Sequence, residues 1–430
     1  MGTKEEVFLR AADRAGLAFQ SGKDIHRASY RPQENAILSP QGIAGRTTDS
    51  RLLRYPQARG CTFCGHCYQG CLEPLGAPRN LTAKRSTDNS YIPMAVTADR
   101  WSRHGRPIEL ITDAFVERIL VASHPDGLRA RGIIWRHDET GQQTEEEARV
   151  VVLAAGAIET PRLWLGSGLP DPNGWVGRGC TYHHPQVVGG VMPFYTGASK
   201  GPGSGARADV PGRGSLFGVQ AGPSIAATVL AYSQHNSGPG RRLVGNELRH
   251  ALSHIDRTLG IVVLTDDDVE PANRVTLSAT ARDEHGPVPR VELIPPGARS
   301  RRTRANRAHL TALAVRVLWA AGARDIYRPD QPPLLFHIHS TMRMGADERD
   351  SVLDPHAEAR AVTRLFIADN SALSNALGGP NPTLTTQALA TRTAERIFSR
   401  YFHGEPWVRN ETPTPSTHPS VTRAMRASGL

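Results

Sequence analysis

Hydrophobic and polar residues alternate along two neighbouring segments of the chain, 115–121 and 130–136. A period of two is typical of strands with one buried face, and the HPDG stretch at 124–127 between them is a hairpin turn signal. A shorter alternating run at 108–112 precedes them. The pattern predicts a small β-meander in this part of the chain.

Two uninterrupted apolar runs predict buried strands that end at turns. The stretch RVVVLAAGA covers 149–157, and a helical pattern with Pro161 near its first turn follows. The stretch LFIAD covers 365–369 and ends in Asp369. Apolar strands that end in a carboxylate present it to a ligand at the carboxyl edge of a sheet. Gly156 has no Cβ, so a pyrophosphate or ribityl chain can approach the strand–helix joint closely.

Residues 186–334 combine short strands with one long helix, and they predict an antiparallel sheet with helices that carries the substrate-facing wall. The strands are expected at 187–194, 226–232, 260–265, 274–277 and 288–293, and the helix at 301–321. Further helices are expected at 5–19, ending at Gly16, and at 383–397, after a GGPNP turn. The acidic triplet at 266–268 is interpreted as a solvated turn rather than a metal site.

Length and composition bound the class of protein. The 430 residues are enough for two domain-sized cores, and 39% of them are hydrophobic but only 6% aromatic. No apolar run approaches the roughly 20 residues that a transmembrane helix needs. The first segment, 1–16, is amphipathic and carries acidic side chains, unlike a signal peptide. We therefore expect a cytoplasmic protein.

The net charge of +10 comes almost entirely from arginine. Only four of the 51 lysine and arginine residues are lysines, namely Lys4, Lys23, Lys84 and Lys200. A nucleic-acid-binding protein gathers such charge with aromatic residues along one face. Here the arginines are scattered, apart from a run at 299–307 that is typical of a solvated helix start. No nucleic-acid partner is expected.

Four of the five cysteines fall within eleven residues, with the spacing C-x2-C-x2-C-x3-C. They are Cys61, Cys64, Cys67 and Cys71. This spacing resembles the iron–sulfur run of bacterial ferredoxins. A zinc site and a metal-free turn lined by reduced thiols are the alternatives. Disulfides are not expected in a cytosolic chain.

The C-terminal part carries an ordered series of motifs. HIHSTMRMG covers 337–345, VLDP covers 352–355, LFIADNS covers 365–371 and NPTLTTQALA covers 381–390. In this order and spacing they resemble the C-terminal signature of the glucose–methanol–choline (GMC) flavoprotein oxidoreductases. Ser340 departs from the family, which has glycine there. The stretch GAIETPRLWLGSGL at 156–169 resembles the second GMC signature, with Trp164 in place of an aliphatic residue.

The resemblance implies FAD as the cofactor and a small-molecule alcohol as the substrate. His337 matches the family's catalytic histidine and would take the hydroxyl proton as the alcohol carbon gives up a hydride. Asn381 matches its His/Asn partner and would hydrogen-bond the alcohol oxygen. His339 is a rival base, because residues two apart share one face of a strand. The motifs do not identify the alcohol or the electron acceptor.

The resemblance also implies which residues surround FAD. Val116 would meet the adenine, Asp369 the ribityl–pyrophosphate region, and Pro382 and Thr383 the flavin ring. The full set of residues implied at the cofactor is Val116, Gly156, Ala157, Asp369, Asn370, Pro382 and Thr383.

The implied fold class is α/β plus α+β, an incomplete Rossmann-like FAD-binding domain with an antiparallel-sheet substrate domain. The FAD-binding domain would comprise 108–185 and 335–402, and the substrate-binding domain 186–334. Segment 1–107 would hold the N-terminal helix, a loop and the cysteines, and 403–430 is expected to be a disordered tail.

The dinucleotide fingerprint G-x-G-x-x-G, expected between a strand and a helix, is absent from the chain. A misplaced gene start, a protein partner that supplies the ADP-binding unit, and loss of flavin binding would each explain this. Three hypotheses follow. The first is a GMC-type alcohol oxidase or dehydrogenase, the second a flavin-free remnant or partner subunit, and the third an iron–sulfur electron-transfer subunit built on the cysteines.

Overall fold

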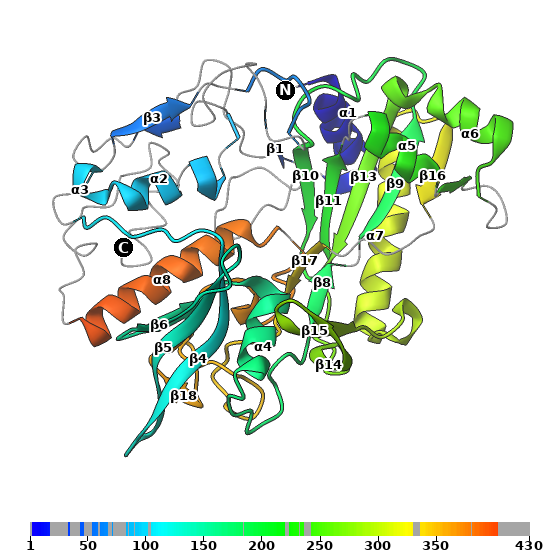
Figure 1. Ribbon diagram of the computed structural model, residues 1–430. Helices are drawn as coiled ribbons and strands as arrows, with labels where there is room; N and C mark the ends of the chain where they lie inside the picture. The colour runs from blue at the N-terminus through cyan, green and yellow to red at the C-terminus, as the bar shows by residue number, and fades with distance from the viewer. Residues whose placement is uncertain are drawn as a thin grey trace, which may run out of the picture.

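The computed structural model describes residues 2–17, 33–34, 44–46, 54–58, 61–67, 71, 83–84, 86–89, 91–101, 105–183, 185–219, 223–231, 233–235, 242–329, 336–379 and 381–402. These residues form two lobes, one around a large antiparallel sheet and one around smaller sheets (Figure 1). None of the helices in the described ranges is both long and apolar enough to cross a membrane. The expected tail, 403–430, lies outside the described residues.

The large sheet has seven strands, all paired antiparallel. In spatial order they are β1 (Gln33–Glu34), β10 (Ser204–Val210), β11 (Gly214–Val219), β13 (Thr258–Thr265), β9 (Gln186–Val191), β16 (Asp325–Pro329) and β12 (Ser233–His235). The strands expected at 187–194 and 260–265 are confirmed as β9 and β13, which pair directly. The antiparallel sheet expected from the alternating pattern of this region is confirmed.

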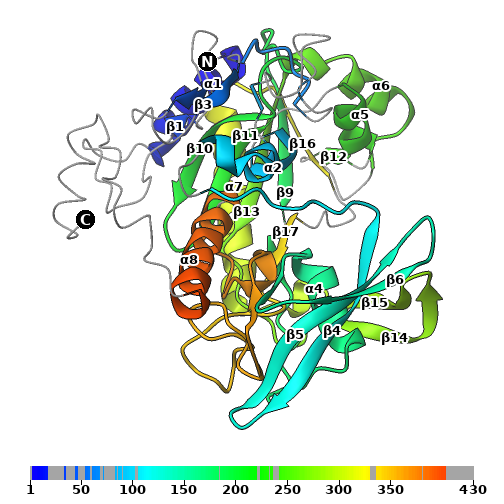
Figure 2. The ribbon, with the colours of Figure 1, turned by 60° about the vertical axis from the view of Figure 1, so that its left-hand side comes forward.

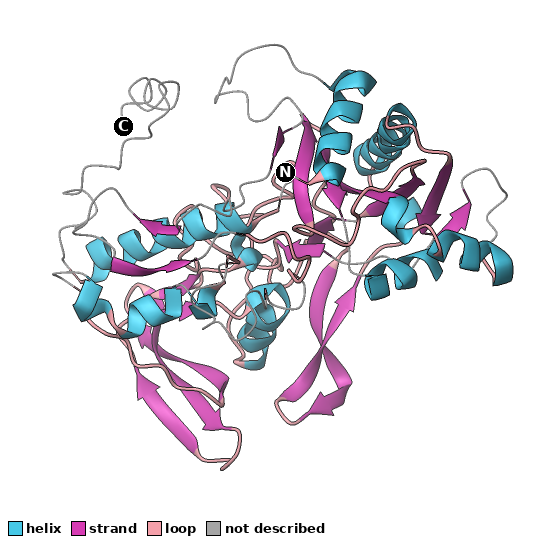
Figure 3. Ribbon diagram, turned by 90° about the horizontal axis from the view of Figure 1, so that it is seen from above, coloured by secondary structure: helices cyan, strands magenta, loops and turns pink. Residues whose placement is uncertain are grey.

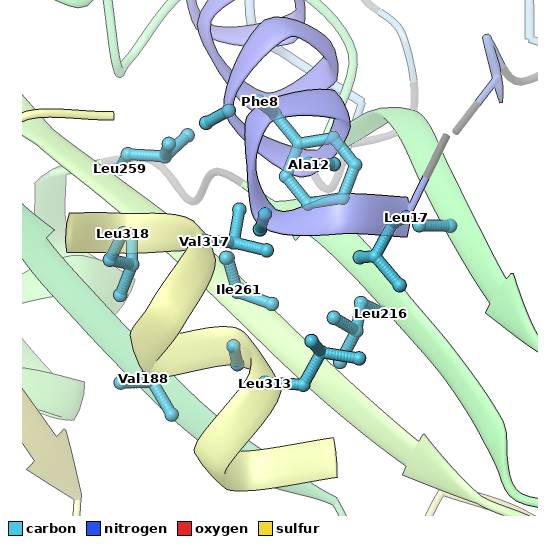
Figure 4. Packing of buried hydrophobic residues seen from close by; sticks show 14 of the residues in the cluster. Phe8, Ala12, Leu17, Val188, Leu216, Leu259, Ile261, Leu313, Val317 and Leu318 are labelled. Atoms are coloured by element: carbon cyan, nitrogen blue, oxygen red, sulfur yellow. The ribbon is translucent and has the colours of Figure 1, made fainter. Parts of the chain in front are cut away.

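Two helices cover one face of the large sheet. α7 (Arg301–Ala320) buries an apolar stripe made by Leu310, Leu313, Ala314, Val317 and Leu318, whose three- and four-residue spacing places them on one face. α1 (Thr3–Ala12), continued by η1 (Asp13–Leu17), packs Phe8 and Ala12 onto the same cluster (Figure 4). Gly16 has a φ of 81°, and the helix ends there, as the sequence predicted.

The acidic triplet at 266–268 is not a solvated turn. Asp267 is 3% exposed, and its Oδ2 lies 3.1 Å from Nη1 of Arg299. Arg302, in the first turn of α7, forms ion pairs with both Asp266 and Asp268. The triplet therefore fixes the start of α7 to the end of β13.

One expected strand, 226–232, is wrong. Residues 226–231 lie in α5 (Pro223–Ala231), which packs with α6 (Gly245–Leu252) and η4 (Ile255–Arg257), and residue 232 lies outside the described residues. Val229 and Leu230 produced the strand-like pattern. Pro223 at the first helical position and three alanines favour the helix instead, because proline fits the first turn and alanine has the highest helix propensity.

The second lobe contains the expected meander. β4 (Ala114–His124) and β5 (Gly127–His137) form the hairpin, and β6 (Gln143–Glu147) and β18 (Val362–Thr363) extend this sheet. β7 (Val151–Leu153) and β19 (Leu365–Ile367) form a separate parallel pair. These are the two buried strands expected before Gly156 and Asp369. α4 (Gly156–Gly166) follows β7, and α8 (Thr383–Tyr401) lies beside this lobe (Figure 2).

The hairpin of β14 (Arg274–Asp283) and β15 (Gly286–Glu292) leaves the large sheet and packs on α4 of the second lobe. Nη2 of Arg162 on α4 lies 2.6 Å from Oδ1 of Asp283. Segment 186–334 therefore contributes to both lobes, although its pattern predicted one substrate domain.

The remaining elements are short. β8 (Thr181–His183) and β17 (Phe336–His339) pair between the two lobes in Figure 1. The others are β2 (Ala44–Arg46), β3 (Arg54–Ala58), η3 (Thr87–Asn89), α2 (Tyr91–Val96), α3 (Ala98–Trp101), η5 (Pro296–Ala298) and η6 (Asn370–Ala372). Figure 3 distinguishes helices from strands throughout the described chain.

Candidate active site

β17 does not alternate as a regular strand. Phe336 pairs with His183 and His339 with Thr181, and the register shifts between them. At the shift His337 has a φ of 56°, an uncommon conformation for any residue other than glycine. Backbone strain of this kind is concentrated at functional sites. His337 and His339 therefore do not share one face of a regular strand, which the sequence pattern had suggested.

Ser340 also has a positive φ, 69°. The family motif has glycine at this position, and glycine adopts such a conformation without steric cost. Ser340 keeps the conformation and is fully buried, with its N–H donating to the carbonyl of Asn370 at 3.2 Å. The next residue, Thr341, donates its hydroxyl to the carbonyl of Ala157 at 2.8 Å. The motif that carries the histidines is thus fastened to the turn after β19 and to α4.

Hydrogen bonds fix the tautomer of His337. Nε2 of His183 lies 2.9 Å from the carbonyl oxygen of Ala376, which can only accept, so this nitrogen carries the proton. Nδ1 of neutral His183 is then an acceptor, and it lies 2.9 Å from Nδ1 of His337. His337 must donate from Nδ1. Its Nε2 therefore has the lone pair that a general base requires.

Burial keeps both rings neutral. Burial, with a smaller contribution from the neighbouring His183, lowers the pKa of His337 to about 4. Burial also lowers the pKa of His183, against a smaller opposing effect of its bond to Ala376. At neutral pH His337 is therefore in the form that can accept a proton.

His339 has a different environment. Its side chain is 0% exposed, and its Nε2 has no hydrogen-bond partner in the described structure. Burial lowers the pKa of His339 to about 3, with His183 and His337 contributing. A residue enclosed in this way cannot contact a substrate that enters from solvent. The geometry favours His337 as the base, and that assignment stays a prediction.

The burial of His339 leads us to expect a loss of stability in acid. The unfolded chain takes up a proton near pH 6.5, whereas the folded chain does so only near pH 3. Stability is therefore complete above pH 6.5 and falls as the pH drops toward 3, by up to about 1.4 kcal/mol per pH unit. Urea unfolding of wild type and His339→Leu at about pH 7 and about pH 4.5 measures this. The variant should lose less stability than wild type over this interval.

His250→Leu is the matched control, because it removes an exposed histidine on α6. It should follow the wild-type pH dependence. Parallel losses in wild type and His339→Leu would contradict a neutral, buried His339.

Asp369 joins the ends of the two parallel strands to α4. Its Oδ2 accepts the N–H of Gly156 at 3.0 Å and the hydroxyl of Thr160 at 2.6 Å. Its Oδ1 accepts the N–H of Ser371 at 2.6 Å. The structure thus brings together Gly156, Ala157 and Asp369, which the sequence suggested from separate motifs.

Gly156 has open space in front of it. Its φ is 88°, and a Cβ built there would meet no atom within 4 Å. The glycine is therefore required by the backbone conformation and not by a close protein neighbour. A cofactor chain can approach the backbone at this joint.

The turn after β19 also contacts the start of α8. Oδ1 of Asn370 accepts the hydroxyl of Thr386 at 2.5 Å, and the carbonyl of Pro382 accepts the N–H of Thr386 at 2.8 Å. Asn381 and Thr383 are exposed at this end of the helix. The first turn of a helix has N–H groups that favour electron-rich ligands. The bond between Asn370 and Thr386 holds the turn after β19 beside the first turn of α8.

Val116 lines a cavity of about 650 Å³ beside β7 and α4. Phe115 lines it too and stacks on His285, with ring centroids 3.8 Å apart. His337 is not among its lining residues. Val116 and His337 therefore do not line the same cavity.

The four clustered cysteines do not form a metal site in the structure. Among the described residues no group of three or more His, Cys, Asp or Glu side chains is placed to hold a metal ion. Cys61, Cys64 and Cys67 are half-buried and Cys71 is buried. Burial raises the pKa of the Cys61 thiol, which favours its protonated form. The iron–sulfur interpretation of the spacing gains no support here.

Sequence reasoning gave His183 no functional role. The structure gives it the direct contact that orients His337. The only signal was its position in a His-His-Pro stretch, and such a pair is more commonly structural. Its carbonyl partner, Ala376, belongs to the loop before the GPNP turn and has no recognisable motif.

The chain is similar in sequence to a known family. Sequence models described as GMC oxidoreductase match residues 53–185 and 270–390, which together are more than half of the chain. The 2-methyl-1,2-propanediol dehydrogenase of Mycolicibacterium austroafricanum is 30% identical over 325 residues, covering 68% of this chain and 55% of that protein. The fructose dehydrogenase large subunit of Gluconobacter japonicus is 29% identical over 437 residues, covering 92% of this chain and 73% of that protein.

The fold of the chain is similar to a solved structure, that of pyridoxine 4-oxidase from Mesorbium loti. The TM-score is 0.56 at 14% identity, over 94% of this chain and 70% of the other. For most of the curated relatives it matches, the chain spans about half of their length.

Proposed function

The chain belongs to the GMC oxidoreductase family, and from this premise we propose that it works as an FAD-dependent oxidoreductase that oxidises the CH–OH group of a small-molecule alcohol. The observation that carries the proposal is the His183–His337 pair, which leaves Nε2 of His337 able to accept a proton. FAD, when bound, supplies the acceptor for the hydride.

His337 would remove the hydroxyl proton of the alcohol. An alkoxide gives up a hydride from its carbon far more readily than the neutral alcohol, so this proton transfer is the step that the protein must promote. His183 positions the imidazole through its Nδ1, and the carbonyl of Ala376 positions His183 in turn. Asn381 would donate a hydrogen bond to the alcohol oxygen from the exposed turn before α8.

The residues around Gly156 fit the hydroxyl-bearing part of FAD. The carboxylate of Asp369 is an acceptor, suited to a ribityl hydroxyl and not to a phosphate. The carboxylate already accepts a hydrogen bond from the N–H of Gly156 at the start of α4. Binding a pyrophosphate takes N–H donors of the kind that a glycine-rich turn provides. We infer that the donors for the pyrophosphate come from a further unit.

The free edge of β7 supports a place for such a unit. Val151 donates to the carbonyl of Arg364 and Leu153 accepts from Ala368, so these two residues bond toward β19. In a parallel ladder the groups of Val152 face the opposite edge, where no described strand pairs with it. Val152 is 44% exposed, and Ala154 and Ala155 beyond it are also exposed.

An open, apolar, two-stranded parallel sheet is unfavourable in water, because parallel sheets are normally covered on both faces and unpaired edges attract other strands. We propose that a partner chain adds a strand, a G-x-G-x-x-G turn and a helix at the free edge of β7. The cavity of about 650 Å³ beside it, lined by Val116 and by 150–155, is within the range that binds cofactors. Such a unit would supply the pyrophosphate donors at one end of that cavity.

The experiment is to purify the chain alone and together with a co-expressed unit made of a strand, a G-x-G-x-x-G turn and a helix, and to record visible spectra. Flavin absorption is expected only when both are present, and it should bleach on addition of an oxidisable alcohol. Flavin bound to the chain alone would contradict the partner and leave the flavoenzyme proposal standing. Colourless protein in both preparations would refute flavin binding and favour a flavin-free remnant.

A further inference from the structure

A second cavity, of about 660 Å³, lies on the side of α7 near the start of β9 and the end of β16. The charged residues in its wall are all arginines. Arg299, Arg304 and Arg307 come from α7 and the turn before it, and Arg328 comes from β16. No aspartate or glutamate is among its described lining residues. Neither His337 nor Val116 is among the residues that line this cavity, so it is separate from the proposed active site.

Within the ranges that the structure describes, acidic side chains neutralise only part of the charge of these arginines. Among the described residues the one ion pair is that of Arg299 with Asp267, at 3.1 Å. Arg307 bonds only to a neutral acceptor, Oε1 of Gln186, at 2.9 Å. Neither Arg307 nor Arg328 forms an ion pair within the described part of the chain. Four guanidinium groups therefore face one carboxylate.

Two of these groups are also held away from water without full hydrogen bonding. Arg299 is 5% exposed and lies over the ring of Tyr182 at 4.2 Å, and its Nε has no hydrogen-bond partner. The Nε of Arg307 is likewise buried without a partner. Burying an unsatisfied donor on a cation is costly, and neighbouring cations add repulsion. Burial and the charge of Arg299 accordingly lower the pKa of Arg307.

We propose that this arginine cavity binds a small molecule through a doubly charged oxyanion, as in a phosphate monoester. A guanidinium group offers paired N–H donors that match the oxygens of phosphate or carboxylate. The excess of three positive charges favours a dianion over a monocarboxylate. Thr303 and Thr311 provide neutral hydroxyl groups in the same wall. The cavity volume leaves room for a ligand larger than the oxyanion itself.

The test uses the full chain and two probes, inorganic phosphate and glycerol phosphate, at constant ionic strength made up with chloride. Isothermal titration calorimetry and the midpoint of thermal unfolding are the readouts. Both probes should bind and raise the midpoint, and acetate at the same concentration should bind at least about tenfold more weakly. Tighter binding of glycerol phosphate than of phosphate would identify the cavity as a site for the monoester. Equal binding would limit the site to the oxyanion alone.

Two variants on different elements keep the test independent of folding defects. Arg307→Gln on α7 and Arg328→Gln on β16 should each weaken phosphate binding by about tenfold or more. Arg301→Gln is the matched control, because it removes the same charge from α7 at an exposed position outside the cavity wall. It should change binding by less than about twofold.

Two results would overturn the proposal. One is the absence of binding for both probes up to about 10 mM, which is weaker than a specific site of this charge should be. The other is an equal loss of affinity in Arg301→Gln and Arg307→Gln, because general attraction to a basic protein would then explain the binding. Circular dichroism of each variant without ligand establishes that the comparison is made between folded proteins.

Discussion

Replacing His337 with asparagine is expected to lower the rate of alcohol-dependent flavin reduction by about 10²- to 10⁴-fold, the usual contribution of a general base. Asparagine is the informative replacement because it tolerates the positive φ of 56° at this position better than alanine does. The loss should therefore come from the missing imidazole and not from the backbone. Stopped-flow bleaching of the flavin, in the chain combined with the dinucleotide-binding unit, measures it.

The choice of alcohols for this assay follows the relatives, whose names include a propanediol dehydrogenase, a C-glycoside 3-oxidase and a long-chain-alcohol oxidase. His339→Asn is the comparison variant. It should change the rate by less than about tenfold, because the His339 side chain is fully buried. The opposite ranking of the two variants would move the base to His339.

The pH dependence separates the roles of His337 and His183. The base must be neutral, so the reduction rate should be constant above about pH 5 and fall as the pH drops through about 4, the lowered pKa of His337. His183→Leu should reduce the rate by about 10- to 100-fold, as loss of an orienting partner does. Because His183 also lowers the pKa of His337, the acidic limb of the pH–rate profile should move to higher pH in this variant. An unchanged limb would mean that His183 does not act on His337.

The sequence predicted the ends of the strands before Gly156 and Asp369 better than it predicted the strands of segment 186–334. The runs that end at Gly156 and Asp369 have the length and apolar character of buried strands, and the structure pairs them in parallel. The residues 226–232 were misassigned because Val229 and Leu230 satisfy a strand pattern as well as a helical one. Local periodicity cannot choose between the two when a run is this short.

The choice between His337 and His339 also depended on something that local pattern does not contain. Strict alternation gives the two histidines equivalent positions, and the register shift opposite β8 removes that equivalence. Such a shift depends on the partner strand, which is more than 150 residues away in sequence. The role of His183 escaped prediction for the same reason, because nothing near it in sequence indicates its contact with His337.

Replacing Asp369 with alanine is expected to lower the free energy of unfolding by about 3–5 kcal/mol, the largest single effect on stability that we expect in the second lobe. The carboxylate accepts three hydrogen bonds, from the N–H groups of Gly156 and Ser371 and from the hydroxyl of Thr160. Ser371 and Thr160 are both 0% exposed, so their donors cannot turn to water instead. Urea unfolding at neutral pH measures the loss.

The Asp369→Asn variant should lose less, about 1–3 kcal/mol, because its amide keeps one acceptor oxygen and places a donor where the other stood. A double-mutant cycle of Asp369→Asn with Thr160→Val isolates the 2.6 Å bond, and a coupling of about 1 kcal/mol or more is expected. Glu159→Gln changes a carboxylate on the same helix that is 44% exposed, and it should cost less than about 0.5 kcal/mol. If Asp369→Ala costs no more than Glu159→Gln, Asp369 does not fasten β7, β19 and α4 together. The placement of a cofactor chain at Gly156 would then lose its structural basis, since the position of that glycine depends on the same carboxylate.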